Sequence, residues 1–184
     1  TQHAVVCFGD SASLSNQVTS NYRMNQLPIH KVANDSIFDN QSTYDTVAVS
    51  GINDLAAAAI VSVTIDSLYH TYDGDIEIGL YAPDGSYTVL SGQNGDSGDN
   101  YFGTVFAAGS SADITASFPP YAGTYAPQGG FNSFSGPADG NWVLAVTDYA
   151  GGDQGIIKGW SMQFSIADTI LTLSWTPSTG LSSP

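Results

Sequence analysis

The sequence predicts an all-β fold, specifically a jelly-roll-like antiparallel β-sandwich, from three observations. Apolar residues alternate with polar ones at a period of two, which places one side of each segment in a core and the other in water. Turn-forming residues interrupt these segments at short intervals. Helical signals are nearly absent, which argues against folds that join parallel strands by crossover helices. Many short strands between frequent turns are typical of a two-sheet sandwich or a jelly roll.

Four segments carry the alternation most clearly, namely 61–65, 76–80, 142–146 and 160–166. Turn signals such as Asp73-Gly74 and Asn94-Gly95 fall between them. Trp142 and Trp160 lie on alternating segments, so we expect both to anchor the core, with ligand binding as the rival interpretation. His70 stands at the end of a predicted strand, where a hydrogen-bonded structural role is expected rather than a catalytic one.

The chain divides into three zones by pattern. Residues 1–45 are polar and irregular, which suggests a leader or an upstream linker. Residues 46–167 carry the dense β pattern and form the expected sandwich. Residues 168–184 hold one possible strand at 170–175 and then a tail rich in Pro and Ser. We interpret this last zone as a C-terminal linker or the start of a further module.

The charge balance is strongly acidic, because 17 acidic residues face three basic ones and the net charge is −14. Such a surface repels nucleic-acid phosphates and anionic membranes. The longest apolar stretch, 56–61, is far too short to span a bilayer. A single cysteine, Cys7, allows no internal disulfide. Few Lys and Glu residues beside many Gly, Ser, Thr, Asn and Tyr are typical of a secreted bacterial β-protein, so we expect an extracellular or cell-surface location.

Three blocks in order give the chain a family resemblance. The first is His70-Thr-Tyr-Asp-Gly74-Asp75 between two alternating segments, and the second runs from Gly123 to Gly136. The third begins Gly140-Asn-Trp-Val-Leu and ends at residue 164. Together they resemble the P domain (P/Homo B domain) of subtilisin-like proprotein convertases and secreted bacterial proteases. The resemblance implies a non-catalytic sandwich that stabilises or regulates a neighbouring protease domain of the same chain.

Acidic loops are the best site candidates, since all but one of the acidic residues are Asp and the exception is Glu77. Aspartate favours turns and is also a hard oxygen ligand for Ca²⁺, which takes about six to eight oxygens. The candidate metal ligands are Asp73, Asp75, Asp96, Asp99, Asp113, Asp148 and Asp153. By resemblance to bacterial P domains, Asp75, Asp113 and Asp148 are favoured for Ca²⁺. The alternative is that these loops are ordinary solvated turns.

One departure from the family pattern affects the calcium expectation. Relatives tend to show Phe-Asp-Asp where this chain reads Phe106-Ala107-Ala108, and the nearest acid is Asp113. One calcium site is therefore expected to be lost or moved. The loop after Asp96 is not an EF-hand either, because its twelfth position is Ala107 rather than Glu.

The sequence does not support a catalytic function for this segment. Gly9-Asp10-Ser11 resembles the nucleophile block of an esterase class that also needs an Asp-x-x-His near the C-terminus. The nearest Asp and His pair, Asp66 and His70, has the wrong spacing and lies in mid-chain. The Asp, His and Ser blocks of subtilisins are missing, and so is an HExxH metal motif. We therefore expect this segment not to be an enzyme, although its parent protein could be a serine endopeptidase or a metalloprotease.

A non-proteolytic alternative is a cell-surface interaction, adhesion or glycan-binding module. Tyr101, Tyr121, Tyr125 and Tyr149 are predicted loop aromatics that could stack on sugars. The rival interpretation is that these rings cover the edges of the core.

Overall fold

The structure is a computed structural model. It describes the backbone of residues 13–25, 28–52, 55 and 58–176, and side chains within 28–166 outside the gaps. The chain divides into two compact units, one of Thr1–Arg23 with Ala167–Pro184 and one of Met24–Ile166. The second unit contains the residues on which the functional argument rests.

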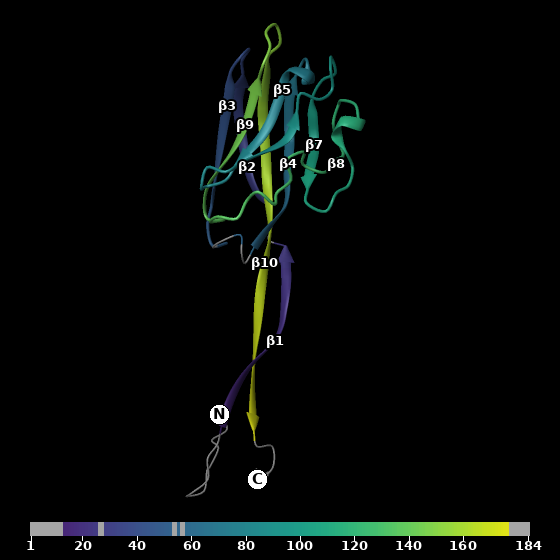
Figure 1. Cartoon of the computed structure of the whole chain (residues 1–184). Helices are drawn as coiled ribbons and strands as arrows, with labels where there is room; N and C mark the ends of the chain where they lie inside the picture. Colours follow the sequence, from purple (N-terminus) through teal and green to yellow (C-terminus); the bar gives the residue numbers. More distant parts are fainter. Residues whose placement is uncertain (1–12, 26–27, 53–54, 56–57, 177–184) are drawn as a thin grey trace, which may run out of the picture. The chain divides into compact units, whose positions relative to one another are not determined.

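Ten strands and two short 3₁₀ turns make up the described chain (Figure 1). They are β1 (Ser13–Asn25), β2 (Ile29–Ile37), β3 (Ser42–Val49), β4 (Ala58–His70), η1 (Asp73–Asp75), β5 (Ile76–Tyr81), β6 (Tyr87–Gly92), β7 (Tyr101–Ala107), η2 (Ile114–Ala116), β8 (Thr124–Tyr125), β9 (Gly140–Asp148) and β10 (Gly155–Thr176).

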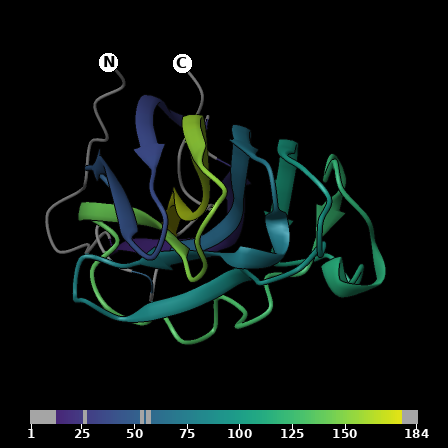
Figure 2. The same cartoon turned by 90° about the horizontal axis from the view of Figure 1, so that it is seen from above.

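The strands form two sheets that pack as a sandwich, which confirms the predicted fold class (Figure 2). One sheet has the order β1-β10-β4-β7-β8, and β2 also pairs with β10. The other has the order β3-β9-β5-β6, and its neighbouring strands are antiparallel. In the first sheet β7 and β8 are parallel. Here the larger sheet is called sheet A and the smaller one sheet B.

Trp142 and Trp160 anchor the core as predicted, because both side chains are fully buried. The Trp160 indole N–H donates to Asp45 Oδ2 at 2.8 Å, and the Trp142 indole N–H donates to the Ala138 carbonyl at 2.8 Å. Each ring is therefore fixed by its only polar atom as well as by packing. Trp142 also meets the ring of Phe164 edge-on, at a centroid distance of 5.8 Å.

The N-terminal zone differs from the expectation, since residues 29–45 are not a linker but form β2 and the start of β3. β2 pairs with β10, and β3 pairs with β9. The sequence pattern hides these strands because polar side chains outnumber the inward-facing apolar ones. Individual side chains of these strands are nonetheless buried in the sandwich. Ile37 is fully buried, and the buried carboxylate of Asp45 lies 3.5 Å from Lys31 Nζ.

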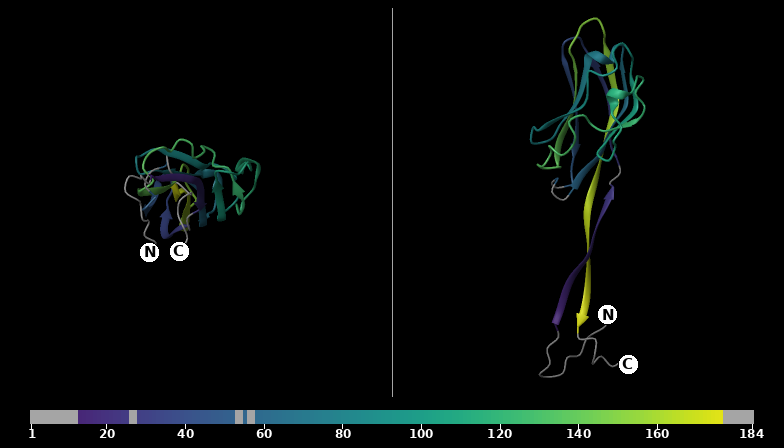
Figure 3. Two further views of the ribbon diagram at one scale, coloured as in Figure 1. Left: turned by 90° about the horizontal axis from the view of Figure 1, so that it is seen from below. Right: turned by 45° about the vertical axis from the view of Figure 1, so that its right-hand side comes forward.

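The other unit contains most of β1 and the last part of β10, and these two strands are neighbours in the sheet order (Figure 3). The strand predicted at 170–175 lies within β10. Among the described residues, no helix is long and apolar enough to cross a membrane.

Candidate functional site

Most of the predicted site residues lie at one end of the sandwich. The register of the paired strands shows which strand ends meet there. The start of β5 pairs with the end of β9 and the end of β6, and the start of β10 pairs with His70 at the end of β4. The loops 71–75, 93–100 and 149–154 therefore meet at this end. Together with Asp148 at the end of β9, they carry every predicted metal ligand except Asp113. Two separate groups of side chains form there.

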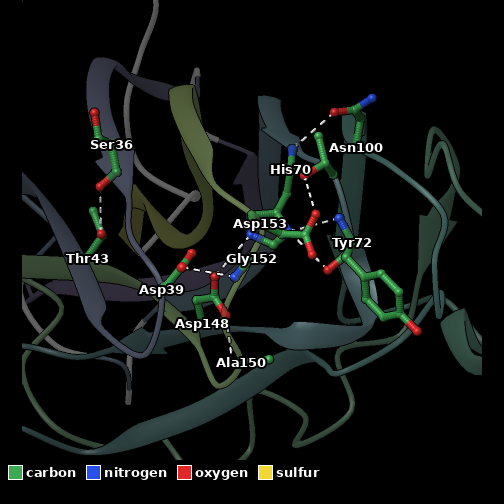
Figure 4. Close-up of polar contacts among 11 residues, drawn as sticks. Ser36, Asp39, Thr43, His70, Tyr72, Asn100, Asp148, Ala150, Gly152 and Asp153 are labelled. Carbon is green, nitrogen blue, oxygen red and sulfur yellow. Dashed lines mark hydrogen bonds and ion pairs between the residues drawn. The ribbon is translucent and has the colours of Figure 1, made fainter.

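The first group is a buried network around His70, drawn in Figure 4. His70 Nε2 lies 3.3 Å from Asp148 Oδ2, and both side chains are almost completely buried. The backbone N–H of Ala150 donates to the other oxygen, Asp148 Oδ1, at 2.9 Å. His70 Nδ1 lies 3.0 Å from the Tyr72 carbonyl, and Asn100 Oδ1 accepts from the His70 backbone N–H at 3.1 Å. Every polar atom of the His70 ring and the Asp148 carboxylate thus has a partner.

Asp75 lies beside this network without a direct bond to it. Partial burial raises the pKa of Asp75, and repulsion from the carboxylates of Asp148 and Asp153 raises it further, while His70 opposes the shift. Asp153 is itself engaged, because its Oδ1 accepts from the Thr71 hydroxyl at 2.7 Å. The structure therefore places Asp75, Asp148 and Asp153 together, as a carboxylate group balanced in part by His70.

The second group, here called the Asp73 cluster, comprises Asp73, Asp96, Asp99 and Tyr121 around Gly95. The Asp73 side chain is fully buried, and neither carboxylate oxygen has a hydrogen-bond partner among the described residues. The hydroxyl of Tyr121, also fully buried, lacks a partner as well. Burial raises the pKa of Asp73 from 3.8 to about 7; the nearby backbone N–H of Asn100 opposes this shift, and the charge of Asp99 adds to it.

Backbone contacts between two loops hold this cluster together. The Asp73 N–H donates to the Gly98 carbonyl at 2.8 Å, and the Gly74 N–H donates to the Asp96 carbonyl at 2.9 Å. Gly95 lies close to Asp73 and Tyr121, and its backbone φ of +106° is one that glycine tolerates. A Cβ at Gly95 would lie 3.2 Å from Asp73 Cβ and 3.2 Å from the Tyr121 hydroxyl oxygen. Asp73 and Tyr121 therefore converge on the same glycine.

Asp113 lies apart from both groups, near the opposite ends of β7 and β8. It caps η2, because its Oδ1 accepts from the Thr115 backbone N–H at 2.9 Å. It also borders a shallow pocket with Ser111, Thr115 and Gln128. The structure consequently does not bring Asp113 together with Asp75 and Asp148, the other two favoured ligands.

A metal site made of acidic side chains alone does not form in the part of the chain that the structure describes. No three His, Cys, Asp or Glu side chains converge there closely enough to hold a metal ion. Any cation at this end of the sandwich must therefore also use hydroxyl, carbonyl or water oxygens, which Ca²⁺ accepts readily.

The predicted loop aromatics divide by burial. Tyr101 and Tyr121 are fully buried and Tyr125 is 8% exposed, so these three cover the core edge and cannot present a face to a sugar. Tyr149 is 53% exposed. Tyr101 and Tyr121 pack against each other with ring centroids 4.8 Å apart. The role of Tyr121 beside Asp73 has no sequence signal, because the two lie 48 positions apart. The esterase-like block at Gly9-Asp10-Ser11 lies outside the described residues.

Comparison with known proteins relates this chain to one family and to several larger proteins. Residues 58–164 match the family described as proprotein convertase P-domain. Leupeptin-inactivating enzyme 1 of Streptomyces exfoliatus is 30% identical over 119 residues, which cover 64% of this chain and 21% of that protein. The crystal structure of an Aeromonas sobria serine protease in complex with a chaperone shares the fold, with a TM-score of 0.55 and 18% identity over 80% of this chain and 27% of that one. The chain thus spans about a fifth to a quarter of the length of the proteins it matches.

Proposed function

This chain belongs to the proprotein convertase P-domain family, and from that premise we propose that it is the accessory domain of a secreted protease. In this role it would perform no catalysis itself. It would pack against a protease domain of the same polypeptide and stabilise or regulate it. The family match over residues 58–164 is the observation that carries the proposal.

The proportions of the matched proteins support an accessory role. This chain corresponds to only 21% of the Streptomyces enzyme and 27% of the Aeromonas serine protease, so most of each protein lies outside the shared region. In the described part of this chain, the buried His–Asp pair has no nucleophile on its other side, because His70 Nδ1 faces the Tyr72 carbonyl. A carbonyl accepts a proton in a hydrogen bond but cannot be activated for attack. The pair is therefore interpreted as structural.

A surface suited to a neighbouring domain lies on the outer face of sheet A. Tyr69 on β4 is 45% exposed, and its ring meets Phe102 on β7 edge-on at a centroid distance of 5.2 Å. Ile156 on β10 pairs with Tyr69 in the sheet, and Val32 on β2 is 88% exposed. Exposed aromatic and aliphatic side chains of this kind commonly form the centres of interfaces. We propose this face as the contact with the protease domain.

Calcium binding is the second part of the proposal. The end of the sandwich that carries the loops 71–75, 93–100 and 149–154 fits a cation with oxygen ligands. The carboxylate of Asp73 is fully buried there and makes no hydrogen bond to the described residues. When bound, Ca²⁺ would supply positive charge to this end and cross-link the loops 71–75 and 93–100. Binding to the folded state alone would raise the stability of the domain.

The accessory role is tested in the full-length protein that carries this chain. Deletion of residues 58–164 should shorten the thermal half-life of proteolysis while leaving the peptide cleavage chemistry of any folded fraction intact. Tyr69→Ser should shorten it less, and Tyr44→Ser on sheet B, a comparably exposed tyrosine, should leave it unchanged. An unaltered half-life after the deletion would contradict the accessory role. Equal effects of the two tyrosine variants would contradict the assignment of sheet A.

A further inference from the structure

Three oxygen atoms of the Asp73 cluster make no hydrogen bond to the residues that the structure describes, although they lie in a buried part of the domain. They are both carboxylate oxygens of Asp73 and the hydroxyl oxygen of Tyr121. Buried polar atoms in folded proteins nearly always have a partner, and leaving one unsatisfied is unfavourable, more so for a charged group. The Asp73 Cβ and the Tyr121 hydroxyl both border Gly95, and burial together with the charge of Asp73 raises the pKa of Tyr121. A single ligand bound to both side chains would therefore satisfy all three oxygens.

The negative charge of this cluster indicates that such a ligand carries positive charge. Asp99 adds negative charge next to Asp73, and Asp96 lies close enough to Tyr121 to disfavour its ionisation. The two lysines are engaged elsewhere, since Lys31 lies 3.5 Å from Asp45 and Lys158 donates to Asn34 at 2.7 Å. No basic side chain described by the structure compensates Asp73, so its charge is neutralised either by a proton, in keeping with its raised pKa, or by a cation from solution.

The donor atoms identify the class of cation. The unpartnered atoms are all oxygens, and the surrounding side chains and backbone add further oxygens but no thiolate or imidazole. His70 is not available, because both of its ring nitrogens face other groups. Oxygen-only sites with one or more carboxylates and irregular backbone suit Ca²⁺, whereas Zn²⁺ prefers nitrogen and sulfur.

The neighbouring carboxylate group is a poorer site by the same criteria. Asp148 uses one oxygen for His70 and the other for the Ala150 N–H. Asp153 accepts from Thr71, which leaves Asp75 as the one carboxylate of that group without a hydrogen bond to the described residues. A cation bound there would meet only one carboxylate that is not already engaged in a hydrogen bond.

We therefore propose that Ca²⁺ binds at the Asp73 cluster, with the Asp73 carboxylate as its buried charged ligand and the Tyr121 hydroxyl beside it. The exposed carboxylates of Asp96 and Asp99, backbone carbonyls of the loop 93–100 and water would complete the oxygen shell. This assignment rests on the calcium part of the proposed function and moves the site away from Asp75, Asp113 and Asp148.

Calorimetric titration of the chelator-treated full chain with CaCl₂ tests the assignment. Asp73→Asn should weaken binding by about 100-fold or abolish it, and Tyr121→Phe should weaken it by about tenfold, the range seen when groups that support a metal are lost. Asp75→Asn is the matched control, because it removes an equal charge on the other side of Gly74, and it should change the affinity less than threefold. Circular dichroism and thermal melting of each variant establish that it is folded.

Two contrary outcomes are distinguishable. If Asp73→Asn retains wild-type affinity while Asp75→Asn or Asp148→Asn loses it, the Asp73 site is wrong but calcium binding stands. If the wild-type chain shows neither binding heat nor a thermal shift at millimolar CaCl₂, both the site and calcium binding are overturned. The accessory role is unaffected by either result, since it is tested by the half-life of the full-length protease.

Discussion

Asp148 and Asp73 are both buried carboxylates at the same end of the sandwich, but their surroundings are opposite. Asp148 faces His70 and receives the Ala150 N–H, so each of its oxygens has a partner. Asp73 lies three residues after His70 in the sequence, yet neither of its oxygens has one among the described residues. The comparison teaches that burial alone does not distinguish a structural carboxylate from a binding one, whereas the count of unsatisfied oxygens does.

The difference also separates stability from function. A satisfied buried pair holds its loops in place, and removal of one partner leaves an uncompensated group. An unsatisfied buried carboxylate opposes folding unless a ligand supplies what it lacks. The predictions below change one member of this comparison at a time and are ordered from the largest expected effect to the smallest.

Removal of the partner of Asp148 should have the largest effect. We expect His70→Ala to lower the free energy of unfolding by about 3–5 kcal/mol, because it leaves the Asp148 carboxylate buried with only one hydrogen bond. Urea denaturation monitored by tryptophan fluorescence measures the loss. A change below about 1 kcal/mol would show that the pair behaves as if it were exposed.

A methyl group placed between Asp73 and Tyr121 should have the next largest effect. Gly95→Ala would put a Cβ 2.7 Å from Pro119 Cγ at a backbone φ of +106°. We expect a loss of about 3 kcal/mol, of which roughly 1–2 is backbone strain and the remainder is steric crowding. Gly85→Ala is the control, because its φ is +86° and no atom lies within 4 Å of the added Cβ. Equal losses in the two variants would mean that the Gly95 contact is not tight.

Neutralising the unsatisfied carboxylate should stabilise the protein when calcium is absent. In chelator at pH 8, we expect Asp73→Asn to raise the free energy of unfolding by about 2 kcal/mol. Each unit of the raised pKa of Asp73 corresponds to roughly 1.4 kcal/mol, and the total over the whole shift is reduced to this value because solvent screens the charge. The same denaturation assay measures it. Destabilisation by this variant in chelator would show that the carboxylate has a partner in the folded chain.

This gain should depend on pH in a defined direction. The pKa of Asp73 is raised from 3.8 to about 7 in the folded protein, so the folded state holds the proton more tightly than the unfolded chain. In the metal-free protein, stability should therefore fall as the pH rises through this window, and Asp73→Asn should remove that fall. Below pH 4 the stabilising effect of the substitution should vanish.

The smallest effect is expected at the isolated acid. Asp113→Ala removes an exposed cap of η2 and should cost about 1 kcal/mol. Its calcium affinity should equal that of the wild type, since Asp113 lies near the opposite end of β7. A loss of calcium binding in this variant would favour the resemblance-based ligand set over the Asp73 cluster.

Sequence reasoning predicted the sandwich well because its signal is local. The alternation around Trp142 and Trp160 and the turns between strands follow directly from period and composition. β2 and the first half of β3 were missed because polar residues such as Asp35 and Asp45 lie on the inward face with Ile37 and Val47, while Val32 lies on the outward face. Their strand character depends on pairing with β10 and β9, which no local pattern reveals.

The site was predicted in its parts but not in its arrangement. The acidic loops were singled out as candidates, and all the predicted ligands but Asp113 lie at one end. Which carboxylate is satisfied could not be read from the sequence, because Asp73 meets residues that follow it by about 20 to 50 positions, such as Gly95 and Tyr121. Burial and hydrogen bonding between such distant segments are properties of the packed fold alone.

The most direct test is the position of calcium in crystals of the chain grown with CaCl₂. Anomalous diffraction at long wavelength should show a peak within about 2.3–2.6 Å of a carboxylate oxygen of Asp73, the usual distance for Ca²⁺ and oxygen. A peak beside Asp75 and Asp148, or an Asp73 carboxylate that contacts only water, would contradict the central claim that the unsatisfied carboxylate is the one that binds.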